Sequence, residues 1–75
     1  MREDRHTVVL VYSTSHALRA EKVLAEAGIP CKLIPVPRQL SSDCGVCIRV
    51  QTDDRGATRR VLDEAGLETE GIHDV

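Results

Sequence analysis

The feature that most constrains the fold is a short internal repeat. Residues 23–29, VLAEAGI, recur 38 positions later as VLDEAGL at residues 61–67. The same offset aligns Val8 with Val46, in the apolar runs that precede the two copies. Two copies of a strand–helix–strand unit are the pattern of the split βαββαβ arrangement. The repeat therefore predicts an α+β, ferredoxin-like fold, with a four-stranded antiparallel sheet and two helices on one face.

Two segments have the apolar spacing of helices. We expect the first to be capped within residues 13–15 and to run to about Ala27, because Gly28 and Pro30 then end it. The second should be capped within residues 52–54 and end at Gly66. The apolar residues expected on its core face are Ala57, Val61, Leu62 and Ala65.

Four segments are rich in β-branched or apolar residues and are predicted to be strands. They are residues 7–12, 31–37, 46–50 and 71–75. Pro35 and Pro37 cannot donate to a ladder, so the second strand should lie at an edge. Alternation in the third strand places Cys47 and Arg49 on one face and the three aliphatic residues on the other.

Size and composition limit the class of protein. The 75 residues predict a single domain, residues 1–75, and the only aromatic residue is one Tyr. A net charge of −2 and the lack of stacking aromatics argue against nucleic-acid binding. No run is apolar enough for a membrane span or a signal peptide, and three cysteines are an odd number for a disulfide framework. These features predict a cytoplasmic protein.

Reactive side chains, turn residues and the start of a strand coincide in only one segment, residues 41–47, SSDCGVC. In the predicted topology the first and third strands are antiparallel neighbours at the centre of the sheet. The start of the first helix, residues 13–16, and the loop at residues 38–45 should therefore lie at the same end of the sheet. This places Cys44 near a helix N-terminus, where a thiolate is stabilised.

The segment supplies a candidate site around one thiol. We expect the pKa of Cys44 to fall below the value of about 8.5 for a free cysteine. Ser41 and Ser42 would donate hydrogen bonds to a thiolate or to a bound sulfur atom. His16 would pair with the thiolate or shuttle a proton. Gly45 would allow close backbone approach and unusual dihedral angles.

Other functions remain open from the residues alone. Cys44 and Cys47 form a C-x-x-C motif, which suggests a thiol–disulfide redox module, although the motif leads into a strand rather than a helix. A zinc site would need about four ligands, so neither a metal nor a cofactor is expected. An open sheet face would also suit an interaction or regulatory module, including a homodimer formed through that face.

The chain also resembles the selenium/sulfur carrier protein-like family, a small bacterial family long catalogued as a domain of unknown function. The segments that carry the resemblance are residues 13–21, 28–30, 33–38 and 41–45. The resemblance implies a carrier rather than a turnover enzyme, with a persulfide or perselenide on Cys44. It also implies a donor such as a cysteine desulfurase and an acceptor protein. Cys47 departs from the family pattern, in which a small residue such as Ala is ordinary.

Overall fold

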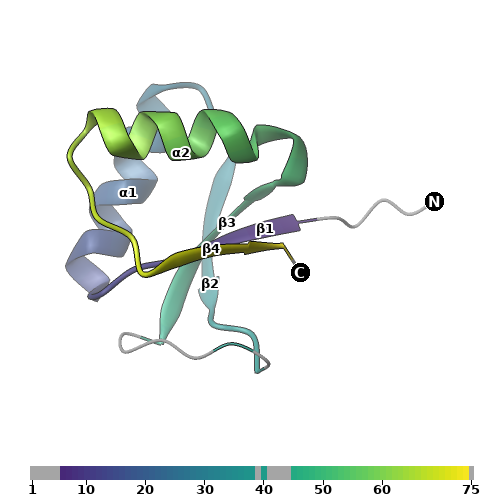
Figure 1. Ribbon diagram of the computed structural model, residues 1–75. Helices are drawn as coiled ribbons and strands as arrows, with labels where there is room; N and C mark the ends of the chain where they lie inside the picture. Colours follow the sequence, from purple (N-terminus) through teal and green to yellow (C-terminus); the bar gives the residue numbers. More distant parts are fainter. Residues whose placement is uncertain (1–5, 39, 41–44, 75) are drawn as a thin grey trace.

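The computed structural model describes residues 6–38, 40 and 45–74. Both helices lie on one side of a single sheet (Figure 1). In chain order the elements are β1 (His6–Leu10), α1 (Thr14–Glu26), β2 (Cys31–Pro35), β3 (Val46–Gln51), a 3-10 turn η1 (Thr52–Asp54), α2 (Arg55–Glu64) and β4 (Gly71–Asp74). Neither helix is long and apolar enough to cross a membrane, within the residues described.

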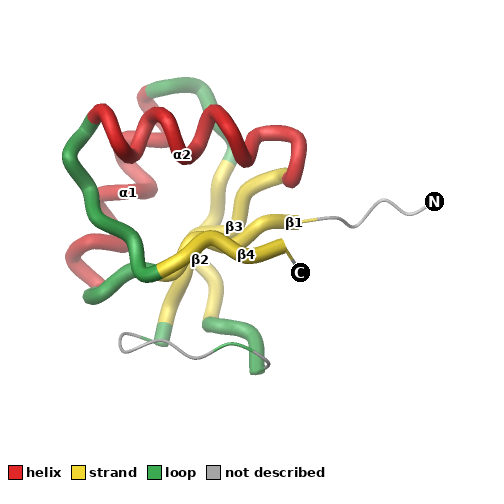
Figure 2. The backbone as a smooth tube through the Cα atoms, viewed as in Figure 1, coloured by secondary structure: helices red, strands yellow, loops and turns green. Residues whose placement is uncertain are grey.

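The sheet confirms the predicted fold class. Its strand order is β2-β3-β1-β4, and every neighbouring pair is antiparallel. The central strands are β1 and β3, and the proline-containing β2 lies at an edge, as its sequence predicted. Colouring by secondary structure makes the two layers plain, with helices above strands (Figure 2).

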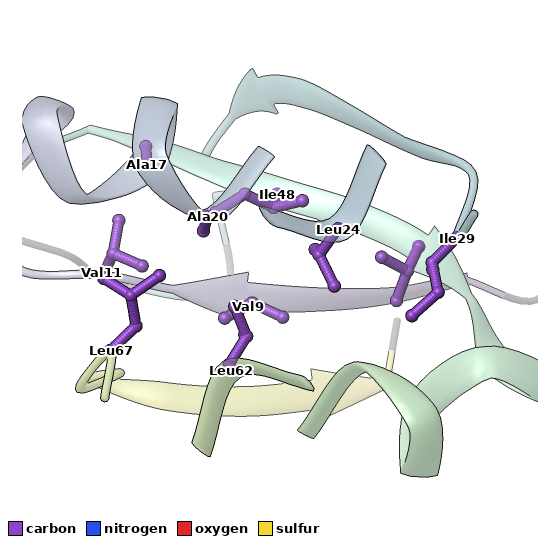
Figure 3. Packing of buried hydrophobic residues seen from close by; sticks show 10 residues of the cluster. Val9, Val11, Ala17, Ala20, Leu24, Ile29, Ile48, Leu62 and Leu67 are labelled. Atoms are coloured by element: carbon purple, nitrogen blue, oxygen red, sulfur yellow. The ribbon is translucent and has the colours of Figure 1, made fainter. Parts of the chain in front are cut away.

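The core lies between the helices and the sheet, and it is almost entirely aliphatic. Leu24 and Leu62 come from the two helices, and both are 0–1% exposed. They point toward Val9 and Ile48 of the central strands (Figure 3). The other buried members of this cluster are Val11, Ala17, Ala20, Ile29, Val50 and Leu67. Burial on this scale is the main stabilising term for a chain without Phe or Trp.

The offset of 38 residues relates equivalent positions in the two helices, but equivalent positions in the two strands are displaced from it by one residue. Gly28 and Gly66 end the two helices with φ of +80° and +74°, as the offset of 38 predicts. Val8, however, lies opposite Arg49, on the helix-free face, whereas Val46 packs against the helix-covered core. The prediction that Val8 and Val46 are equivalent was therefore wrong. Successive side chains alternate between faces, so an odd change of spacing before the helix reverses the pattern.

The predicted core face of α2 is also corrected. Ala57 is exposed, and the residue that packs inward beside Leu62 is Thr58, which is 0% exposed. Thr58 precedes Leu62 by four residues, so the two share one side of the helix. The Oγ1 atom of Thr58 is buried without a hydrogen-bond partner in the described structure. A pattern of apolar residues alone does not predict this position, because Thr carries a hydroxyl.

Part of the helix-free face is buried by the chain itself. Val8, Leu10 and Cys47 are 0–4% exposed there. Val36 and Leu40, which follow β2, pack against this cluster, together with Ile34. Val8, Leu10 and Cys47 are therefore buried, whereas Ile34 and Val36 remain half-buried at the side of this face.

Candidate functional site

The structure brings the start of α1 and the start of β3 to the same end of the sheet. Leu10, the last residue of β1, lies opposite Cys47, the second residue of β3. Gly45 immediately precedes β3, and α1 begins four residues after β1 ends, at Thr14. Gly45 and the start of α1 therefore lie at the same end of the sheet, as the predicted topology requires.

Three of the predicted site residues, Cys44, Ser41 and Ser42, lie outside the described residues. Their places in the site stay predictions. The two that the structure does describe are His16 and Gly45.

The N-terminus of α1 is capped by a serine that also holds a histidine. Ser13 is the N-cap residue, and its Oγ accepts a hydrogen bond from the backbone N–H of His16 at 3.2 Å. The same Oγ lies 2.6 Å from Nδ1 of the His16 ring, with the donor set by the tautomer of the ring. His16 is half-buried, so its ring is fixed at the first turn of the helix. This orientation was not predicted, although Ser13 was among the expected caps.

No acidic residue lies in the first turn of α1. The unpaired amide groups at a helix start carry a partial positive charge of roughly half an elementary charge. Here the capping side chains are hydroxyls and an imidazole, which do not cancel that charge as a carboxylate would. The start of α1 is therefore suited to an anion.

Gly45 has a conformational role at the entrance to β3. Its φ is +77°, a region that residues with a side chain rarely adopt. Its carbonyl oxygen accepts a hydrogen bond from the N–H of Val36 at 3.1 Å, which joins the two ends of the β2–β3 connection. A Cβ added at Gly45 would meet no described atom within 4 Å. The unusual dihedral is thus observed, and close backbone approach to a described neighbour is not.

The two described cysteines are poorly placed for external chemistry. Cys47 is 0% exposed, and its Sγ lies 4.0 Å from the carbonyl oxygen of Pro35. Cys31 is half-buried on β2, with its Sγ 3.7 Å from the carbonyl oxygen of Glu21. Burial, and then the nearby Glu21 carboxylate, raise the pKa of Cys31 above its ordinary value. A partner's thiol cannot reach Cys47 without opening the structure, which does not favour the redox alternative.

Metal-binding geometry was also sought in residues 6–38, 40 and 45–74. No group of three or more His, Cys, Asp or Glu side chains there is close enough to hold a metal ion.

The helix-free face carries a feature that sequence reasoning missed. Lys32 of β2 lies directly opposite Arg49 of β3, and His73 of β4 lies on the same row, across Val8. Alternation alone had placed Arg49 on the face opposite the aliphatic residues. The row itself is visible only once the strand register is known.

The fold and site define a small split βαββαβ domain in which the start of α1, without an acidic residue in its first turn, and Gly45, which follows a cysteine in the sequence, lie at the same end of the sheet. The family model described as "Putative Se/S carrier protein-like" matches residues 6–74, and the chain belongs to that family. Neither the curated proteins nor the solved structures gave a significant match.

Proposed function

We propose that this protein carries sulfur or selenium, as a persulfide or perselenide on Cys44, and passes it to a partner protein. The observation that carries the proposal is the family match over residues 6–74. Cys44 is the choice of thiol because Cys31 and Cys47, the described alternatives, are half-buried and fully buried. In the sequence it immediately precedes Gly45, which lies at the end of the sheet where α1 begins.

Electrostatics support an anionic cargo at this end. The start of α1 has no carboxylate in its first turn, and its amides and the Ser13–His16 pair offer polar groups to an anion. A thiolate or terminal persulfide anion near this helix start would be stabilised by the same interactions. In our proposal Ser41 and Ser42 add hydroxyl donors, and His16 moves a proton as the sulfur is received or released.

The loading step is a sulfur transfer between thiols. The Cys44 thiolate attacks the outer sulfur of a donor persulfide, R–S–SH. A bond forms between Cys44 Sγ and that sulfur, and the donor's S–S bond breaks. The products are the Cys44 persulfide and the donor thiolate, R–S⁻. The charge and the electrons balance without an added oxidant. Delivery repeats the step with an acceptor thiolate.

Such a carrier needs a reducing environment, because its thiol must stay unoxidised between loadings. We therefore place its activity in the cytoplasm of a bacterium. The donor that suits the step is a cysteine desulfurase, whose product on the enzyme is a persulfide. The acceptor is a second protein with a nucleophilic thiol.

Loading is tested by incubating the protein with a cysteine desulfurase and cysteine, followed by mass spectrometry of the intact protein and its peptides. We expect an added mass of one sulfur atom on the peptide that contains Cys44. Cys44→Ser should abolish it. Cys31→Ser and Cys47→Ala, the matched controls, should load as the native protein does.

Two results would count against the proposal. One is the absence of added sulfur with a desulfurase that is active toward a small thiol. The other is loading on Cys31 or Cys47 that persists in Cys44→Ser. If function instead requires Cys47, and a Cys44–Cys47 disulfide forms under mild oxidation, the redox alternative is correct.

A further inference from the structure

The helix-free face of the sheet carries a row of basic side chains. In the row, Lys32 lies opposite Arg49, Arg49 opposite Val8, and Val8 opposite His73. His6, on β1, lies on the same face two residues before Val8. Lys32 and His73 are exposed, and Arg49 is half-buried. The sheet thus carries four basic side chains on this face, those of His6, Lys32, Arg49 and His73.

No described strand residue on this face is acidic. The residues facing this side are His6, Val8, Leu10, Lys32, Ile34, Cys47, Arg49, Gln51, Gly71 and His73. The whole chain has more acidic than basic residues, with a net charge of −2. Basic residues are therefore concentrated on the described part of this face, although the chain as a whole has a negative net charge.

The Lys32–Arg49 pair costs the fold stability. Like charges directly opposite each other on neighbouring strands repel. Within the part of the chain that the structure describes, neither side chain forms an ion pair with a carboxylate. By contrast, Arg55 at the end of the sheet is paired with Asp74 at 2.8 Å. Because this pair has no carboxylate partner among the described residues, an anionic group from a partner would relieve the repulsion.

We propose that this face, with Lys32, Arg49 and His73 at its centre, docks an acidic segment of a partner protein. Ile34 and Val36, half-buried beside the basic row, would contact apolar residues of the same segment. An amphipathic helix with carboxylates on one side and aliphatic residues beside them has the required chemistry. The proposal deepens the carrier function by naming the type of partner surface, and it rests on that function only for the partner's role.

Other occupants fit the face less well. A second copy of the chain would bring an equally basic row against this one, and the two would repel. A single-stranded nucleic acid would supply phosphates, but binding by a sheet face draws on stacking aromatics. The one Tyr of the sequence, Tyr12, lies beyond the end of β1, beside residues 66–69 of the connection between α2 and β4. Charge and composition together favour an acidic protein segment.

The test uses a synthetic amphipathic helical peptide of Leu, Glu and Ala, with the glutamates on one side. Its binding to the full chain is measured by fluorescence anisotropy at low and physiological salt, and its site is mapped by NMR of backbone amides. We expect binding that weakens with salt and shift changes centred on residues 32, 49 and 73. Lys32→Glu combined with Arg49→Glu should weaken binding by at least about 10-fold.

The matched control is Lys22→Glu combined with Arg60→Glu, which makes the same change of net charge at exposed positions on the helices. It should change affinity by less than about 2-fold, because its charges lie away from the sheet face. Circular dichroism of both double variants shows that they remain folded. Cys44→Ser should bind the peptide normally. Peptide binding can therefore fail while sulfur loading succeeds, and sulfur loading can fail while peptide binding succeeds.

Three outcomes would overturn the proposal. The first is equal binding of the peptide by the two double variants. The second is shift changes that map to the helices. The third is a 20-nucleotide single-stranded RNA that binds this face more tightly than the acidic peptide, which would assign the face to nucleic acid.

Discussion

The two helices of this domain begin at opposite ends of the sheet, and the residues around their starts differ in charge. The first turn of α1 has no acidic residue and is capped by Ser13, which also holds the ring of His16. The start of α2 follows η1, which contains Asp53 and Asp54. Near it, Arg55 pairs with Asp74, whose carboxylate also accepts a hydrogen bond from Thr7 at 2.7 Å.

This difference shows how one repeated unit supports two roles. The helix ends and the core leucines are equivalent in the two copies, because packing demands the same geometry from both. Core packing does not require the two helix starts to be alike. Asp53 and Asp54 of η1 come immediately before α2, whereas Ser13 precedes α1, although neither helix has an acidic residue in its own first turn. Our proposal places function at the end where α1 begins, because the first turn of that helix has no acidic residue.

The largest effect should come from the core, where the two copies are alike. Leu24→Ala and Leu62→Ala remove side chains that are 0–1% exposed, and each should lower the free energy of unfolding by about 2–5 kcal/mol. Leu18→Ala, at a position 54% exposed on α1, is the control and should change it by less than about 0.5 kcal/mol. Urea denaturation measures all three. A small decrease in the free energy of unfolding for either leucine variant would show that the two copies do not contribute equally to the core.

Removing the N-cap side chain should destabilise the protein more at α1 than at α2. Ser13→Ala removes the side-chain hydrogen bond to the N–H of His16 and should cost about 1 kcal/mol of stability. Asp54, at the corresponding position before α2, makes no side-chain capping bond. Asp54→Ala should therefore cost clearly less in the same denaturation experiment. Equal losses would mean that the two helix starts are stabilised in the same way.

The ion pair near the start of α2 should contribute little and depend on salt. Arg55 and Asp74 are each about half exposed, at 49% and 51%. Arg55→Gln should lower stability by no more than about 1 kcal/mol, and the difference should shrink in high salt because the pair is screened. Sulfur loading of this variant should match the native protein. A loading defect would place this end of the sheet in the functional site.

The smallest effect concerns Cys31, the thiol that lies opposite Val50 at the α2 end of the sheet. Its pKa is raised by burial and by Glu21, so its neutral form is favoured in the folded protein. The resulting stability is present below pH 9.0, the ordinary value, and is lost as pH rises through the raised pKa. Alkylation of Cys31 in the folded protein should therefore be slow near neutral pH. Its rate should increase at higher pH than that of the unfolded chain. Coincident profiles would contradict the shift.

Much of the fold was predictable because helix ends and strand alternation are local signals. The repeat predicted both helices and the central pair of strands, and the two prolines predicted the edge position of β2. The repeat misplaced Val8 because the face of a strand residue depends on a one-residue difference in the connection that follows. Apolar spacing predicted Ala57 on the core face, but the structure buries Thr58, whose hydroxyl without a partner makes its burial hard to predict.

The candidate site was only partly predictable from sequence. Topology placed the start of α1 and Gly45 at one end of the sheet, and the structure agrees for these residues. The hydrogen bond between Ser13 and His16 requires side-chain geometry that no spacing rule supplies. The basic row on the helix-free face joins residues from three strands, so its recognition requires the register of the sheet.

The most direct test of the central claim adds a negative charge to the start of α1 and measures sulfur loading. Ser15→Asp places a carboxylate in the first turn, at an exposed position. Ala25→Asp, near the other end of the same helix, makes the same change of net charge. If the start of α1 stabilises an anionic sulfur on Cys44, Ser15→Asp should load roughly 2- to 5-fold more slowly than Ala25→Asp. Equal loading rates for the two variants would contradict the claim.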